Sequence, residues 1–320
     1  MKHIITAAAA TFALLANDIA QAETVGIAAS RKGSLYDRSG TVIAKVVTNQ
    51  GGLRATLRNF TSPSVYIPAI NRGQVAFGLA NRIEIALAVA GQGHFKGRKH
   101  PNIRAVTIMY PLRIAFFVKK DSPIKTIADL KGKKVPGGFV AQKIILKLMD
   151  AEFETAGMTR KDISAVPVPN IVAGANAFIT GKTDTFLFAL GAPKVREANA
   201  KHGIRALPIA NTPDKLAAVR KHLSVAYLKP EKPRKSNPGI LAPMHVIAYD
   251  AMVFTHKDAS ADAVYKLTKA MHGNKKALAK AFPVFNGFQQ ASMAKDLGAV
   301  KYHPGAIKFY KEKGLWPPKN

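Results

Sequence analysis

The chain has 320 residues, of which 48 are Lys or Arg and 19 are Asp or Glu, so its formal net charge is +29. It contains no cysteine, which excludes a disulfide scaffold, a thiolate metal site and a cysteine nucleophile. Hydrophobic residues make up 48% of the chain, which is typical of a packed globular protein, and the length allows two domains.

The first 22 residues have the layout of a secretory signal peptide. Lys2 precedes an apolar run from Ile4 to Ala16, and Ala20-Gln21-Ala22 is a small-x-small cleavage pattern. The apolar run is shorter than the roughly 20 residues that span a bilayer, so a membrane anchor is the weaker interpretation. We therefore expect cleavage after Ala22 and a soluble protein in the periplasm, without a lipid anchor because the chain lacks cysteine.

Short apolar runs alternate with stretches of helical periodicity along the rest of the chain. Strands are expected at 24–29, 53–59, 74–79, 103–109, 113–118, 166–168, 185–189, 204–209 and 246–255, with another starting at 134. Helices are expected at 35–47, 62–71, 127–130, 139–153, 173–179, 194–201 and 261–281, and a Pro-rich connector at 229–243. This alternation predicts an α/β architecture with parallel sheets.

Five of the predicted strand-to-helix turns are rich in Ser, Gly or Asn. They are residues 30–34, 62–64, 81, 136–138 and 191–193, and Ser64 is a candidate N-cap of its helix. In such folds ligands bind beyond the carboxyl ends of the strands, where free N–H groups at helix N-termini favour anions. One such turn alone indicates ordinary helix capping, whereas five of them favour a shared binding site.

The basic excess has two interpretations. Nucleic-acid binding usually needs a stripe or cluster of basic residues with aromatic platforms. The basic residues are instead spread along the chain, and the densest groups, at 131–134 and 229–235, lie in Gly- or Pro-rich turns without aromatic residues. We therefore favour solubility or attraction to an anionic surface and expect no specific nucleic-acid partner.

Several sequence patterns that could indicate a catalytic or cofactor site are incomplete. Gly181-Lys182-Thr183 lacks the upstream glycine of a phosphate-binding loop, because Asn176 occupies that position. The histidines do not reach metal-ligand spacing, and no serine lies in a Gly-x-Ser-x-Gly elbow. Asp150, Glu152 and Glu154 lie on one predicted helix and indicate a solvated face. We therefore predict no catalytic residue, no metal and no cofactor.

Several stretches of the chain carry a family resemblance. They are 61–65 with 71–81, 95–97 with 101–105 and 110–111, 127–135, 186–193, and 302–306 with 309–315. In these stretches the chain, over about residues 24–315, resembles the TAXI-type solute receptors of TRAP transporters. The resemblance implies a two-lobed, type II periplasmic binding protein, each lobe a mostly parallel sheet flanked by helices.

The resemblance also implies how the lobes are assembled and what they bind. Lobe one would comprise residues 23–112 and 246–320, and lobe two residues 113–245. The two strands that cross between the lobes, near 113–118 and 246–254, would form the hinge. The protein would be a monomer without enzymatic activity. It would capture a small anionic organic acid or an acidic amino acid and deliver it to a TRAP-type membrane permease.

Carried over position by position, the resemblance implies nine ligand-binding residues: Ser34, Tyr36, Ser64, Asn81, Gly137, Gly138, Phe188, Gly191 and Pro193. Two departures bear on the ligand: the first loop contains Arg31 and Lys32, and 236–239 lacks the family's tyrosine. From the residues themselves we add Arg113, whose guanidinium can bind a carboxylate through two parallel hydrogen bonds, although a solvated surface charge is the alternative.

Two other functions stay open at the level of the sequence. One is an exported enzyme on a similar two-lobed scaffold, which would convert its bound compound. The other is a basic protein that binds polyanions through charge alone, with an affinity that salt would abolish.

Overall fold

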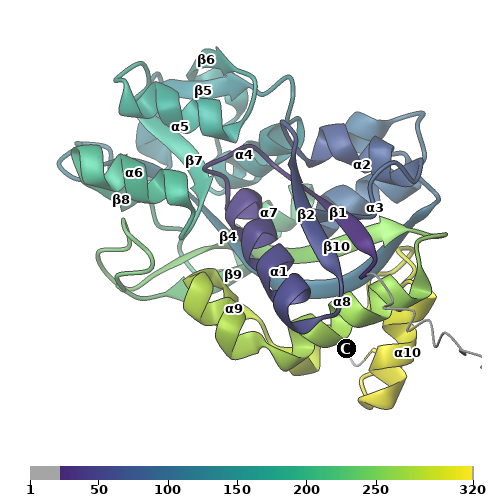
Figure 1. The fold of residues 1–320 in the computed structure, drawn as a ribbon. Helices are drawn as coiled ribbons and strands as arrows, with labels where there is room; N and C mark the ends of the chain where they lie inside the picture. Colours follow the sequence, from purple (N-terminus) through teal and green to yellow (C-terminus); the bar gives the residue numbers. More distant parts are fainter. Residues whose placement is uncertain (1–21, 319–320) are drawn as a thin grey trace, which may run out of the picture.

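The computed structural model describes residues 22–318, so the predicted signal peptide lies, except for its last residue, outside the described part. An eight-stranded sheet in the order β2-β1-β3-β10-β4-β7, with β8 beside β4 and β9 beside β10, forms the centre of the molecule (Figure 1). A separate two-stranded sheet pairs β5 with β6. Helices cover the sheets, which confirms the α/β class.

The N-terminal region, residues 23–112, builds one end of the large sheet. Its elements are β1 (Thr24–Ala29), α1 (Leu35–Gln50), β2 (Arg54–Asn59), α2 (Pro63–Asn71), β3 (Phe77–Asn81) and α3 (Arg82–Ala90). β1 pairs in parallel with both β2 and β3, as the strand–helix alternation predicts.

The middle region, residues 113–245, contains the small sheet and the other end of the large one. Its elements are β5 (Lys134–Gly138), α4 (Ile144–Glu154), β6 (Ser164–Val168), α5 (Ile171–Ile179), β7 (Thr185–Ala189), α6 (Pro193–His202), β8 (Ile204–Ala206), α7 (Pro213–His222) and β9 (Tyr227–Glu231). The C-terminal elements β10 (Met244–His256), α8 (Ala261–Gly273), α9 (Lys275–Ala281), the 3-10 turn η4 (Pro283–Gly287) and α10 (Pro304–Glu312) return to the N-terminal region.

Two long strands connect these regions. β4 spans Ile103–Lys119 and pairs antiparallel with β10, because the chain leaves the N-terminal region along one and returns along the other. β7 and β8 then pair antiparallel with β4, and β9 with β10. The large sheet is therefore mixed, which corrects the expectation of mostly parallel sheets.

Local corrections follow from backbone conformation. The strands expected at 103–109 and 113–118 are one strand, which passes through Pro111 next to an irregularity in β10 at Ala251/Met252. The helix expected to start after Gly138 begins at Ile144, because Gly138 and Phe139 have φ of 77° and 42° and such values cannot continue into a right-handed helix.

Two further expectations about side chains are wrong. Ser62, not Ser64, is the N-cap of α2, because Pro63 takes the first helical position. Glu152, expected on a solvated face, is fully buried in α4. The side chains of Ile144, Ile145 and Leu148 on the same face are also buried, so this face of α4 belongs to the core.

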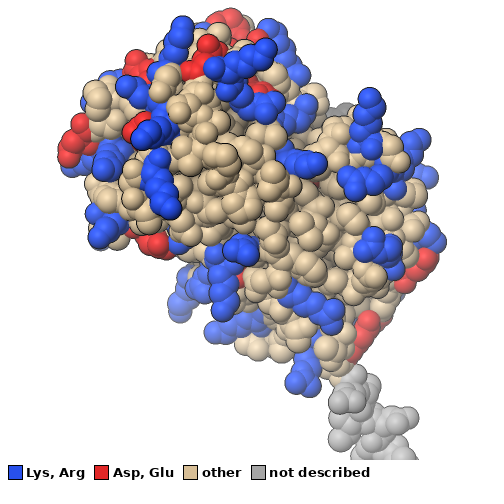
Figure 2. All heavy atoms as spheres, turned by 90° about the horizontal axis from the view of Figure 1, so that it is seen from above, with Lys and Arg blue, Asp and Glu red and all other residues tan. Residues whose placement is uncertain are grey.

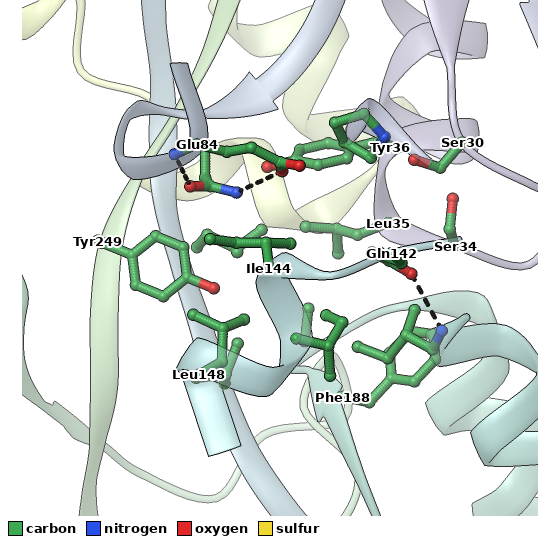
Figure 3. Close-up of a pocket in the computed structure, with 17 residues that line it drawn as sticks. Ser30, Ser34, Leu35, Tyr36, Glu84, Gln142, Ile144, Leu148, Phe188 and Tyr249 are labelled. Atoms are coloured by element: carbon green, nitrogen blue, oxygen red, sulfur yellow. Dashed lines mark hydrogen bonds between the residues drawn. The ribbon is translucent and has the colours of Figure 1, made fainter. Parts of the chain in front are cut away.

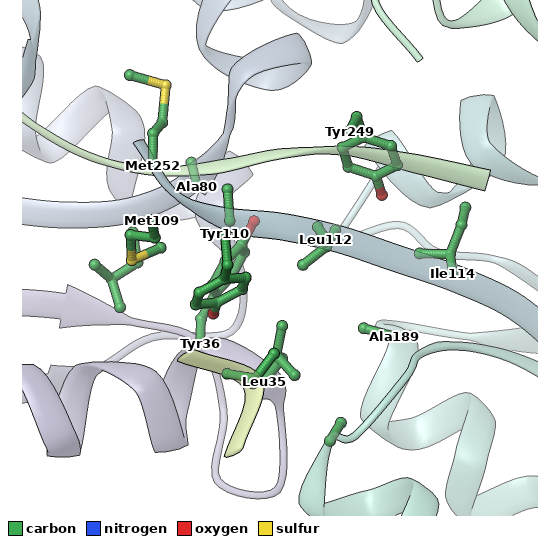
Figure 4. Packing of buried hydrophobic residues seen from close by; sticks show 14 of the residues in the cluster. Leu35, Tyr36, Ala80, Met109, Tyr110, Leu112, Ile114, Ala189, Tyr249 and Met252 are labelled. Atoms are coloured by element: carbon green, nitrogen blue, oxygen red, sulfur yellow. The ribbon is translucent and has the colours of Figure 1, made fainter. Parts of the chain in front are cut away.

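Apolar side chains pack along the two crossing strands. Figure 4 shows Tyr110, Leu112 and Ile114 of β4 beside Tyr249 and Met252 of β10. The Tyr110 hydroxyl lies 2.5 Å from the Ser39 hydroxyl of α1, which satisfies both buried groups. Across residues 22–318, none of the helices has the length and hydrophobicity needed to cross a membrane.

Candidate functional site

A cavity of about 50 Å³ lies where the N-terminal and middle regions meet in front of the crossing strands. Such a volume holds only a few water molecules. The lining residues come from both regions and both crossing strands: Ser30, Ser34, Leu35, Tyr36, Pro63, Asn81, Glu84, Leu112, Ile114, Gln142, Ile144, Ile145, Leu148, Ile171, Phe188, Ala189 and Tyr249. Figure 3 shows Glu84, Tyr36 and Ser30 along one side, with Leu148 and Phe188 along the other.

The first turn of α1 forms one polar part of the wall. Gly33, with φ of 88°, turns the chain after β1, and Ser34 caps α1 by accepting a hydrogen bond from the Asp37 N–H at 3.0 Å. This cap places Leu35 and Tyr36 in the first helical turn, where backbone N–H groups lack helical partners. The positive end of the α1 dipole therefore lies beside the cavity.

Glu84 is the one charged side chain among the 17 lining residues. Asn81 caps α3 by accepting from the Glu84 N–H at 2.8 Å, and its amide lies 3.3 Å from Glu84 Oε2. The Ser64 hydroxyl donates to Glu84 Oε1 at 2.5 Å, and His94 Nε2 lies 3.3 Å from the same oxygen. The carboxyl group is thus fixed in place although it is fully buried.

Two buried tyrosine hydroxyls line the cavity without a hydrogen-bond partner in the described part of the chain. They belong to Tyr36 and Tyr249. Burial raises the pKa of both phenols well above the usual value, so both keep their protons and can donate. Buried donors without partners cost free energy, and a ligand oxygen would satisfy them.

The structure brings four of the ten predicted site residues together around the cavity: Ser34, Tyr36, Asn81 and Phe188. Ser64 reaches it only through Glu84. The remaining five, Arg113, Gly137, Gly138, Gly191 and Pro193, are not among the lining residues.

Arg113 is paired inside the protein. Its Nη1 lies 2.9 Å from Glu231 Oε2, whereas its neighbours Leu112 and Ile114 line the cavity. Successive side chains of a strand point to opposite faces, so Arg113 lies on the other face of β4.

Sequence reasoning missed Glu84, Gln142, Tyr249 and the apolar wall from α4. One signal was present for Glu84, because Asn81 followed three residues later by Glu is the pattern of a capped helix start. No sequence pattern around Tyr249 or Gln142 indicates the cavity, because both residues reach it only through the long-range arrangement of β10 and α4.

Two hydrogen bonds join the regions across the cavity. The Ser62 hydroxyl at the start of α2 donates to the Ala141 carbonyl of the middle region. The Lys194 N–H of α6 donates to the Gly33 carbonyl at 3.1 Å. Both bonds link the N-terminal region to the middle region near residues that line the cavity.

A profile described as the NMT1-like family matches residues 27–314. The chain belongs to the NMT1-like family. This is a family of periplasmic solute-binding proteins, and the prediction of a receptor without enzymatic activity agrees with it. This match shows the family and not the finer TAXI-type assignment.

Solved structures of binding proteins share the fold. MatC from Rhodopseudomonas palustris with bound malate has 15% identity and a TM-score of 0.54, covering 82% of this chain and 88% of that chain. PhnD1 from Prochlorococcus marinus in complex with methylphosphonate has 11% identity and a TM-score of 0.54, covering 92% and 98%. The alkanesulfonate-binding protein SsuA from Xanthomonas axonopodis pv. citri, bound to MOPS, has 16% identity and a TM-score of 0.51, covering 93% and 95%. At these identities the similarity establishes the fold alone.

Proposed function

We propose that this protein is a periplasmic receptor that encloses a small carboxylate or amino acid and delivers it to a TRAP-type membrane permease. The observation that carries the proposal is the cavity between the N-terminal and middle regions, with two buried tyrosine hydroxyls that lack partners. The resemblance to TAXI-type receptors supports the choice of permease.

The two regions act in this proposal as lobes, with residues 23–112 and 246–320 in one and residues 113–245 in the other. β4 and β10 are the hinge, because they are the strands along which the chain passes between the regions. A cavity of about 50 Å³ admits an organic solute only when the lobes separate. A ligand that contacts both lobes then favours the closed arrangement.

The cavity favours a ligand with an oxygen acceptor at one end. Tyr36 and Tyr249 offer phenol donors, and the first turn of α1 offers backbone N–H groups beside a positive dipole end. A carboxylate satisfies these donors. Phe188 and Leu148 provide apolar contact for the carbon chain.

Glu84 favours an amino acid over a simple organic acid. Among the 17 lining residues no Lys or Arg is present to balance a second negative charge on the ligand. A dicarboxylate would place a charge close to a buried carboxyl group, whereas an ammonium group would be attracted to it.

Thermal unfolding of the mature protein with a panel of amino acids and C3–C6 carboxylates tests this function. A specific ligand at ~100 times its Kd adds roughly 2.7 kcal/mol of stability, whereas sulfate and chloride controls report general screening of charge. We expect a zwitterionic amino acid to give the largest shift. A panel in which no solute exceeds the salt controls would contradict the proposed receptor.

A further inference from the structure

A second cavity, of about 220 Å³, lies on the face of β4 opposite the first. Pro111 and Arg113 line it, alternating along the strand with Leu112 and Ile114, which line the first cavity. Its other walls come from β9, with Lys229 and Glu231, from the connector after β9, with Arg234 and Asn237, and from the segment around η4. β9 and the η4 segment, which follows α9, therefore meet at this cavity, and Figure 1 labels β9 and α9.

The charge of this second cavity contrasts with that of the first. Arg113, Lys229 and Arg234 line it with a single carboxylate, Glu231, so the lining has an excess of two positive charges. Lys229 and Glu231 lie two residues apart on β9 and therefore share a face. An excess of cations around a recess favours an anion, and two of the cations are guanidinium groups suited to oxyanions.

Glu231 restricts which anion fits. Its side chain is fully buried, and the contacts made by Arg113 Nη1 at 2.9 Å, Asn237 Nδ2 at 2.9 Å and Arg234 Nη2 at 3.7 Å all go to one oxygen, Oε2. Oε1 has no partner among residues 22–318. A buried carboxylate oxygen without a partner is stabilised by a hydrogen-bond donor. It repels an oxyanion that has no proton to donate.

We infer that this cavity is a binding site for a small free oxyanion that still carries a proton, of which hydrogen phosphate is the test case. Arg113, Arg234 and Lys229 face the negative oxygens, and the P–OH group donates to Glu231. The site is separate from the first cavity, called the solute cavity from here on, and it does not depend on the proposed transport function. An ion bound there contacts both the middle region and the η4 segment of the C-terminal part, behind the crossing strands.

Calorimetric titration with inorganic phosphate and with sulfate, at equal ionic strength, tests the site. We expect one phosphate per chain and at least about tenfold weaker binding of sulfate, which has no proton at neutral pH. Arg234→Gln should weaken phosphate binding about tenfold, the scale of a lost charge-assisted hydrogen bond. Arg234 is half exposed, so the chain should fold without it. Lys235→Gln is the matched control, because it removes the same charge from the same connector but does not line the cavity.

Four outcomes would overturn the inference: no phosphate binding, equal binding of sulfate and phosphate, an equal loss in Arg234→Gln and Lys235→Gln, or tighter binding of glycerol 3-phosphate than of the free ion. The third would show that the net charge of +29 alone attracts the ion. Glu231→Gln offers a separate readout, because an amide can donate to sulfate. This variant should bring the affinities for the two ions together. If Glu231→Gln does not fold, the comparison of Arg234→Gln with Lys235→Gln still tests the phosphate site.

Discussion

Glu152 is a buried carboxyl group without a hydrogen-bond partner in the described part of the chain. It lies one helical turn beyond Leu148, on the side of α4 that faces the solute cavity. Burial raises its pKa from 4.5 to about 8. The folded protein therefore holds this proton more tightly than the unfolded chain does.

This proton makes the stability depend on pH. Between the unfolded pKa near 4.5 and the folded pKa of about 8, unfolding releases the proton, so the free energy of unfolding falls as pH rises through this window. We expect a loss of at least ~2 kcal/mol between pH 5 and pH 8, since each pKa unit corresponds to ~1.4 kcal/mol. Glu152→Gln should remove most of this slope in urea unfolding.

Glu154 in the same helix provides the control for this prediction. Its pKa is lowered, first by its hydrogen bond with Lys221 and then by the one with His222, so its contribution has the opposite sign. Glu154→Gln should leave the loss of stability toward pH 8 in place. Equal pH slopes for the wild type and Glu152→Gln would show that the carboxyl group is not held in this environment.

Tyr249→Phe separates ligand binding from folding. The variant removes a buried hydroxyl that has no partner, so the free energy of unfolding of the empty protein should stay the same or rise slightly. The affinity for the solute identified by the ligand panel should fall about ten- to a hundredfold, as for one lost hydrogen bond to a charged carboxylate. Calorimetry and urea unfolding measure the two effects.

Tyr110→Phe is the matched variant for this test. Its hydroxyl pairs with Ser39 at 2.5 Å, and the residue does not line the cavity. It should lower the free energy of unfolding by about 1 kcal/mol and leave the affinity unchanged. An unchanged affinity in Tyr249→Phe would remove that hydroxyl from the binding site.

The candidate site could be predicted only in part. Ser34 and Asn81 belong to the turns that the residue pattern predicts, and Tyr36 was expected from the family resemblance. All three line the cavity. The position of the Arg113 side chain could not be predicted, because the sequence does not show which face of β4 it occupies. Nor does the sequence show that Arg113 forms an ion pair with Glu231. The cavity is set by how two distant regions meet, which no local pattern contains.

At the scale of elements, strong periodicity predicted most helices and strands. The missed elements had weak signals: α7 follows a polar turn, and β9 contains Pro230 within a connector that reads as Pro-rich. The start of α4 was placed too early because the left-handed backbone at Phe139 is unusual for a non-glycine residue. The antiparallel pairing of β4 with β10 could not be predicted from local patterns, because it depends on how two strands far apart in the chain meet.

In the proposed mechanism, the start of α2 contributes to closure of the cavity. The fully buried Ser62 joins the regions through its hydrogen bond to the Ala141 carbonyl. Ser62→Ala should favour the open arrangement and weaken solute binding a few-fold, since the closed state loses a hydrogen bond. Calorimetric Kd values check this result.

Thr41→Ala is a suitable control for Ser62→Ala. Its hydroxyl bonds only to the Asp37 carbonyl within α1 and is exposed. The affinity should therefore not change. If both variants bind the solute like the wild type, the Ser62 contact plays no part in closure.

At the scale of the whole molecule, the charge of +29 is distributed broadly. Figure 2 shows Lys and Arg scattered around one face of the molecule, with a large area of uncharged residues between them. The view shows no stripe of basic residues of the kind that follows a nucleic-acid backbone. This arrangement favours solubility and weak attraction to anionic surfaces as the role of the charge.

Movement of the two regions about β4 and β10 is the centre of the proposed mechanism. Small-angle X-ray scattering of the mature protein, with and without saturating amounts of the solute found by thermal unfolding, measures it directly. We predict a smaller radius of gyration in the bound state, because the solute holds the regions together across the cavity. Superimposable profiles at a concentration where calorimetry shows full occupancy would contradict the account.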